Sequence, residues 1–311
     1  MPDVVIAFFA LGLLAGLVKS DLKVPDPVYQ ILSIVLMLIL GLKGGQALHG
    51  KFETGMLSTL VPILFLGVLI PLLCYPILRR LVRLGVDDAA SIAAHYGSVS
   101  AGTFAVVLTM VEQAGLVMTP ETTLYLVILE LPAIILMLWL HRRLSPGAGD
   151  NGHGIVREAL TSRGVLLLGG GVVIGYLYGP GGLAALQPVL LDGFKTFLAV
   201  FLLEMGLCTA RVCHPLPWRH WRLMVFAAAA PFVLSWVGIG TALALGLPQG
   251  SALVLAALTA SASYIAAPAA INAAIPQANI GLAMLAALGI TFPINVLIGL
   301  PVFEHWVRIL Y

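Results

Sequence analysis

Two short runs of small and polar residues interrupt apolar segments, one in each half of the chain. They are Gly97-Ser98-Val99-Ser100-Ala101-Gly102-Thr103 and Ala262-Ser263-Tyr264-Ile265-Ala266-Ala267-Pro268, offset by 165 residues. In a bilayer every backbone N–H and C=O needs a partner, so such runs persist at membrane depth only where protein buries them or where they line a polar cavity. Matching runs in two halves indicate a transporter whose substrate site is built from broken helices.

The composition sets these runs in a membrane. Hydrophobic residues make up 60% of the chain and charged residues 10%, and the mean hydropathy is +1.05. A helix needs about 20 apolar residues to cross a bilayer, and the sequence offers about ten such segments. We expect spans near residues 4–18, 27–48, 56–80, 88–112, 120–141, 161–178, 186–209, 219–245, 251–275 and 280–307. The first has the length of a signal peptide but lacks a basic start and a small-residue cleavage site, so we expect it to remain as a span.

The two halves of the chain can be overlaid. Pro27-Val28 matches Pro188-Val189, and Ser98 falls on Ser263. An odd number of spans in each half makes the second half enter the membrane upside down. The sequence therefore predicts an all-α polytopic membrane protein with two inverted five-helix repeats, 1–141 and 161–311, joined by a linker at 142–160. The fourth and ninth helices are the broken ones. The alternative is a chance similarity between two apolar bundles.

Basic residues alternate between the expected loops and predict the orientation. With the N-terminus outside, the two basic residues of the outer loops are Lys51 and Arg308. The inner loops carry twelve: Lys19, Lys23, Arg79, Arg80, Arg83, Arg142, Arg143, Arg157, Arg163, Arg211, Arg219 and Arg222. Because cytoplasmic loops carry the excess of Lys and Arg, this pattern places both termini outside and the linker in the cytoplasm.

The breaks have a clear chemical preference. A half-helix begins with N–H groups that lack acceptors and with the positive end of the helix dipole, which suits an anion. The preceding half-helix ends in free carbonyls, which together with hydroxyls suit a hard cation such as Na⁺. Ser98, Ser100 and Thr103 supply hydroxyls in the first break, and Ser261 and Ser263 in the second. The alternative for each hydroxyl is a hydrogen bond to its own helix.

Charged groups inside the spans are few. Glu130 lies well inside the fifth expected span, where burial of a carboxylate is costly, so it is a candidate for the coupling ion or a proton, with a structural hydrogen bond as the alternative. Lys43 and Lys195 lie near outer span ends and are expected to extend toward the interface. His95 is expected to be a packing residue.

Other classes of function lack their motifs. The three cysteines, Cys74, Cys208 and Cys213, do not form an even disulfide set. The sequence contains no phosphate-binding loop of the Gly-x-x-x-x-Gly-Lys-Ser/Thr type, no His-Glu-x-x-His and no Gly-x-Ser-x-Gly. We therefore expect no enzyme activity, no cofactor and no nucleic-acid partner, and we expect uphill transport to be driven by an ion gradient.

Several motifs resemble the cyanobacterial sodium-dependent bicarbonate transporter family over nearly the whole chain. They are Gly41-Leu42-Lys43-Gly44-Gly45, the run from Gly97 to Thr103, Leu129-Glu130-Leu131-Pro132, Ser261-Ala262-Ser263-Tyr264-Ile265 and Ile275-Pro276-Gln277-Ala278-Asn279. The resemblance implies a trimer in the bacterial inner membrane that takes up bicarbonate with Na⁺. It assigns anion binding to Ser98, Ser100, Ala101, Gly102, Thr103, Ser263, Tyr264, Ile265, Ala266 and Ala267. The hydroxyls of the breaks and the buried carboxylate give the expected sodium-binding residues, which are Ser100, Thr103, Glu130, Ser261 and Ser263.

The chain also departs from that family pattern. Tyr264 stands where the family has an Asp, Ala266 where it has a Ser, and Ala101 where it has a Gly, while Glu130 replaces another Asp. The linker at 142–160 is shorter than the family's cytoplasmic insert, which is the segment associated with a PII-like regulator. A sodium- or proton-coupled carrier of another small organic or inorganic anion therefore stands as the alternative function. A membrane enzyme or receptor would require a polar catalytic cluster or a soluble domain.

Overall fold

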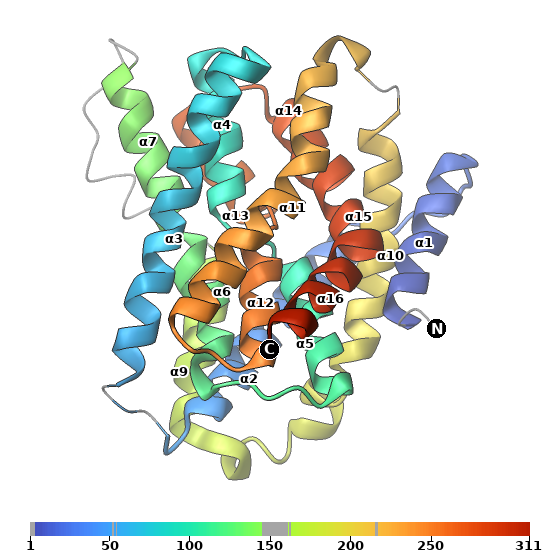
Figure 1. The fold of residues 1–311 in the computed structure, drawn as a ribbon. Helices are drawn as coiled ribbons and strands as arrows, with labels where there is room; N and C mark the ends of the chain where they lie inside the picture. Colours follow the sequence, from blue (N-terminus) through green and yellow to red (C-terminus); the bar gives the residue numbers. More distant parts are fainter. Residues whose placement is uncertain (1–3, 52, 54, 145–160, 162, 215–216) are drawn as a thin grey trace.

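The computed structural model describes residues 4–311 except 52, 54, 145–160, 162, 215 and 216, and all regular structure in this part of the chain is helical (Figure 1). Seven segments within it are long and apolar enough to cross a membrane: α2 (Asp26–Leu48), Met56–Val82, Val86–Ala114, Pro120–Leu144, α9 (Arg163–Gly182), Trp218–Ala244 and Ile280–Leu310. The expected linker begins inside a helix, because α7 (Pro132–Leu144) continues through residues 142–144. The rest of the linker up to residue 160 lies outside the described residues.

The other expected spans are shorter or more polar. The helix α1 (Val4–Leu17) has 14 residues, which cover about 21 Å at 1.5 Å per residue. The helix α10 (Phe194–Val212) is longer but carries Lys195, Glu204 and Arg211. The expected ninth span is divided between α12 (Gln249–Thr259) and α13 (Ala266–Ala274). The described chain is thus an all-helical bundle with seven membrane-length segments.

Glycine rows bring two pairs of helices into close contact, α2 against α9 and α1 against α10. A Cβ atom placed on Gly41 would lie 2.9 Å from Cα of Gly171, and one on Gly45 would lie 2.7 Å from Cα of Gly175. On α1, a Cβ atom on Gly12 would overlap the backbone of α10. Small residues four positions apart allow helix backbones to approach closely in a membrane, where packing rather than hydrophobic burial holds helices together. We call these contacts the glycine seams.

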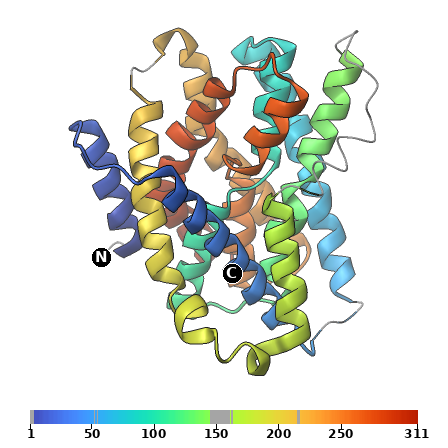
Figure 2. The ribbon, with the colours of Figure 1, turned by 180° about the vertical axis from the view of Figure 1, so that it is seen from behind.

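Two broken helices run in opposite directions through the middle of the molecule (Figures 1 and 2). The first consists of α4 (Val86–Gly97) and α5 (Ala101–Ala114), and the second of α12 and α13. The N–H of Gly250, at the start of α12, donates to the carbonyl of Val117, just beyond α5, at 2.9 Å. At the other end, the N–H of Asn279, beyond α13, donates to Asp88 Oδ1 in α4 at 2.8 Å. The breaks therefore meet at mid-height.

Four other helices pack against the first halves of the two broken helices. The helices α3 (Met56–Ile77) and α7 pack against α4, while α11 (Trp221–Ala244) and α16 (Leu300–Leu310) pack against α12. Between Ile280 and Leu310 the last segment changes to π-helix twice, in η5 (Leu285–Thr291) and η6 (Asn295–Gly299). Such turns often mark functional positions, and both Thr291 and Asn295 are fully buried.

Candidate functional site

The first break is short and is closed by a serine cap. Residues 98–100 are non-helical, and Ser100 is the N-cap of α5, where its Oγ accepts the N–H of Thr103 at 3.0 Å. A serine cap satisfies one of the first four N–H groups of a helix. By position, the N–H groups of Ala101 and Gly102 have no acceptor within the helix. Ala101, Gly102 and Thr103, expected in the break, thus form the first turn of α5.

The second break covers residues 260–265 and ends earlier than expected. Ala266, Ala267 and Pro268 belong to α13 rather than to the break. Proline is tolerated in a first turn because its missing N–H would have no partner there. Ser263 Oγ accepts the N–H of Ala267 at 3.3 Å, so Ser263 holds the first turn of α13 much as Ser100 holds that of α5.

Hydrogen bonds join the two breaks directly. The N–H of Ser263 donates to the carbonyl of His95 at 2.8 Å, and the N–H of Ser100 donates to Ser261 Oγ at 3.0 Å. Ser261 Oγ in turn donates to the carbonyl of Leu258 at 2.8 Å. All these residues are buried. Both breaks are therefore fixed against each other by the backbone groups that the interruptions release from the helices.

A small buried space between the breaks brings many of the expected site residues together. It has a volume of about 10 Å³, which is about the minimum for one water molecule. We call it the central cavity; its walls are Met37, Val99, Ser100, Ala101, Leu126, Glu130, Ser263, Tyr264, Ile265 and Ala266. A second space of about 10 Å³, the side cavity, shares Met37, Ala101 and Ile265 with it and reaches Gly102. Both first turns border the central cavity.

Tyr264 fills much of the room beside the first turn of α5. Its side chain is 5% exposed, and its ring lies 5.2 Å from the ring of Phe292 in an edge-on arrangement. A Cβ atom on Gly102 would overlap the Tyr264 hydroxyl. Among the described residues this hydroxyl has no hydrogen-bond partner of good geometry. Where the family pattern has a carboxylate, this chain thus places a neutral phenol against a helix N-terminus.

Glu130 forms another part of the cavity wall. It ends α6 (Leu124–Glu130) and is 4% exposed, and its Oε2 has no hydrogen-bond partner among the described residues. Gly164, in the first turn of α9, lies so close that a Cβ atom there would be 2.5 Å from Glu130 Oε1. The positive end of the α9 dipole therefore faces the carboxylate. Ser98 does not line the cavity; its Oγ donates to the backbone carbonyl of Glu130 at 2.8 Å.

The residues expected to bind sodium fall into two groups. Ser100, Ser263 and Glu130 line the central cavity, whereas Ser261 and Thr103 do not. Thr103 Oγ1 is nevertheless buried and has no partner among the described residues. Ala267 is fully buried outside both cavities. Within the described part of the chain, no three His, Cys, Asp or Glu side chains gather in a way that could hold a metal ion.

Asn295 is a buried polar residue that the sequence analysis missed. It is fully buried in η6, and its Nδ2 donates to the carbonyl of Ala260 in the second break at 2.8 Å. Its Oδ1 has no partner among the described residues. A neutral amide inside a span is, like a charged group, costly to bury without a partner. An Asn within the apolar run Phe292-Pro293-Ile294 and Val296-Leu297 was the available signal.

Comparison with known proteins assigns the chain to a family. The sequence model of the Na⁺-dependent bicarbonate transporter superfamily matches residues 4–308. The chain belongs to this superfamily. As one of its members, it is a multi-pass membrane transporter and not an enzyme, and sodium is an ion that such a transporter handles rather than a cofactor. No curated protein matches the chain.

Proposed function

We propose that this chain carries bicarbonate inward together with sodium and binds the anion between the first turns of α5 and α13. The observation that carries this proposal is that both first turns border one buried cavity whose walls, within the described part of the chain, contain no lysine or arginine. The N–H groups of Ala101, Gly102 and Ala266 lack intrahelical acceptors by position. Two helix N-termini offset one negative charge in a site of low dielectric constant.

The size of the site favours a small anion. The central cavity holds about one water molecule in this conformation, so binding requires its walls to separate. Tyr264 and Ile265, which close the space beside Ala101, are the side chains whose movement would enlarge it. The Tyr264 hydroxyl then becomes available as a hydrogen-bond donor to the anion. A planar ion of few atoms needs the smallest such movement.

Sodium is proposed to bind oxygen atoms in the wall of the central cavity together with the buried hydroxyl of Thr103. Glu130 Oε2 and Thr103 Oγ1 are buried oxygens without partners among the described residues, and Ser100 and Ser263 add hydroxyls. A hard cation prefers such oxygen ligands. A sodium ion bound there offsets the charge of the Glu130 carboxylate, which would otherwise repel the anion in a buried site.

The two halves are proposed to be inverted repeats of five spans each. Each of these helix contacts in one half has a counterpart in the other, as a two-fold relation requires. The packing of α1 on α10 corresponds to that of α9 on α2, and the packing of α3 on α4 corresponds to that of α11 on α12. The opposite directions of the two broken helices support the same view. The boundaries are proposed at 1–141 and 161–311. The loop charges support the proposal that both termini are extracytoplasmic. The family resemblance supports a trimer and a PII-like regulator.

Uptake into proteoliposomes tests the proposal. We expect labelled bicarbonate to accumulate under an inward sodium gradient and not under a matched potassium gradient, with formate and acetate as competing anions. Ala101→Leu fills both cavities and should abolish uptake, while Ala244→Leu, on the exposed end of α11, should leave it unchanged. Normal uptake by Ala101→Leu would place the anion elsewhere. Preference for acetate, or no response to sodium, would favour the alternative anion carrier.

A further inference from the structure

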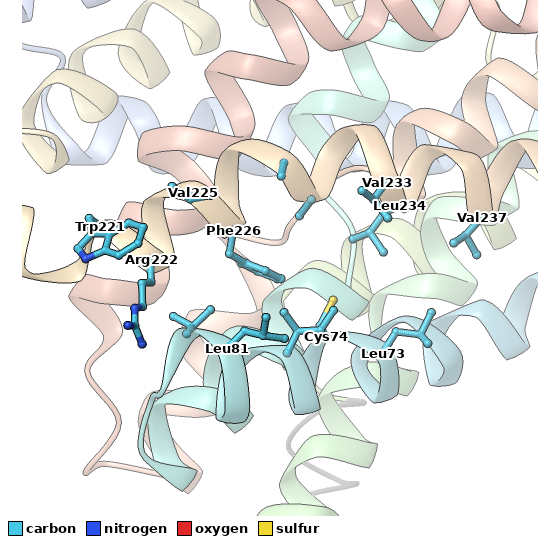
Figure 3. Close-up of a pocket in the computed structure, with 14 residues that line it drawn as sticks. Leu73, Cys74, Leu81, Trp221, Arg222, Val225, Phe226, Val233, Leu234 and Val237 are labelled. Carbon is cyan, nitrogen blue, oxygen red and sulfur yellow. The ribbon is translucent and has the colours of Figure 1, made fainter.

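A long apolar groove lies on the outside of the bundle, between α3 with η1 (Leu78–Val82) and α11. Its volume is about 550 Å³, and on α11 it extends from Trp221 to Val237 (Figure 3). This stretch spans about 24 Å at 1.5 Å per residue. One leaflet supplies about 15 Å of hydrocarbon, half of roughly 30 Å, so the groove is longer than one leaflet is deep. Both walls belong to membrane-length segments, so the groove lies at membrane depth.

The walls differ from the helix contacts of this chain. The glycine seams are rows of small residues, whereas the groove presents Leu73, Leu81, Val225 and Val233, all large and exposed. Branched side chains on both walls leave an irregular channel that a second helix does not fill closely, but that a flexible hydrocarbon chain follows. The groove is therefore better shaped for an acyl chain than for a helix.

One end of the groove is basic. Arg222 is the single charged residue in the described lining, and its guanidinium lies over the ring of Trp221, 5.5 Å from the centroid. Leu81 of η1 lies near this end (Figure 3), and Arg80 and Arg83, on the same turn of chain, are exposed. Arg222 forms no ion pair within the described residues. Tryptophan and arginine at a span end mark the depth of lipid headgroups.

We infer that the groove between α3 and α11 binds one anionic phospholipid, with an acyl chain along the groove and the headgroup phosphate on Arg222. An arginine guanidinium binds phosphate oxygens through paired hydrogen bonds. A zwitterionic lipid also carries a phosphate, but its positive headgroup weakens the net attraction to arginine. The acyl chain would contact Phe226. The ring of Phe226 lies edge-on to that of Tyr96, with 5.0 Å between the ring centroids, next to the first break. The bound lipid would thus stabilise the packing of Phe226 against α4.

Native mass spectrometry of the purified chain tests this inference. The protein in detergent is exposed to equimolar dioleoylphosphatidylglycerol and dioleoylphosphatidylcholine, and retained lipid is counted. We expect about one phosphatidylglycerol per chain, about tenfold weaker retention in Arg222→Gln, and unchanged retention in Arg219→Gln, whose exposed side chain lies outside the groove. Equal retention by both arginine variants would overturn the headgroup assignment.

A second pair of variants tests the acyl chain. Ala229→Trp fills the groove and should abolish retention, while Ala244→Trp, on the same helix beyond the groove, should not. Glycerol phosphate, which has the phosphate but no acyl chain, should not protect the protein from thermal unfolding, whereas phosphatidylglycerol should. Protection by glycerol phosphate, or retention by Ala229→Trp with a normal melting temperature, would overturn the inference.

Discussion

Lys43 of α2 forms an ion pair with Glu112 near the end of α5, with Nζ 3.0 Å from Oε1. The same ammonium group lies 4.8 Å from the centroid of the Phe194 ring. The ion pair therefore joins α2, which is part of the glycine seams, to α5 of the first broken helix. Lys43 was expected to extend toward the interface, and no signal in the sequence indicated an acidic partner on another helix within its reach.

Reversing one charge of this pair should destabilise the protein slightly, and reversing both should restore it. The Lys43 and Glu112 side chains are 21% and 39% exposed, so the pair contributes about 1 kcal/mol or less. We expect Lys43→Glu or Glu112→Lys to lower the melting temperature and the double variant to recover most of the loss. Lys43 lines neither cavity, so the KM for bicarbonate should stay unchanged in the double variant. A raised KM would bring Lys43 into the anion site.

Gly102 and Tyr264 should show strong coupling. A Cβ atom on Gly102 would overlap the Tyr264 hydroxyl, while the nearest ring carbon of Tyr264 would lie 3.4 Å away. We therefore expect Gly102→Ala to lower the melting temperature, and Tyr264→Phe in the same chain to relieve the loss. A double-mutant cycle should give a coupling of about 1 kcal/mol or more. Additive effects would mean that Tyr264 moves aside without cost.

Thr103→Val should weaken sodium binding without destabilising the fold. Thr103 Oγ1 has no hydrogen-bond partner among the described residues, so an isosteric valine should leave the melting temperature unchanged or raise it. Loss of a hydroxyl ligand to an ion should weaken the apparent sodium affinity about tenfold. Thr109→Val is the matched control, since Thr109 Oγ1 is equally buried and without a partner among the described residues but lies further along α5, beyond the first turn at the break. Equal sodium affinities in both variants would remove Thr103 from the site.

The sequence located the two breaks within a few residues, because a break has a local signature. Small and hydroxyl residues weaken a helix wherever they cluster in an apolar segment, and Ser100 and Ser263 lie where this predicts. The errors are also local. Pro268 was placed in the break, but it lies in the first turn of α13, where proline is tolerated.

The partners across the bundle could not be predicted from one sequence. Tyr264 against Gly102, Asn295 against Ala260 and Lys43 against Glu112 each join residues far apart in the chain. Helical periodicity says which face of a helix is apolar, but it does not set the height at which two helices cross. The helix ends that close the central cavity were therefore predictable, while the side chains that fill it were not.

Glu130→Gln should test whether the buried carboxylate couples transport to an ion. Glu130 lines the central cavity and its Oε2 has no partner within the described residues. Glutamine keeps the shape and removes the charge, so the variant should fold with an unchanged or higher melting temperature, because a buried charge is costly. We expect bicarbonate uptake by this variant to lose its stimulation by a sodium gradient, since a sodium ion loses its one carboxylate ligand in the cavity wall. Glu121→Gln is the matched control, because Glu121 is also buried but lines neither cavity. Unchanged sodium stimulation in Glu130→Gln would leave the carboxylate with only a structural role beside the first turn of α9.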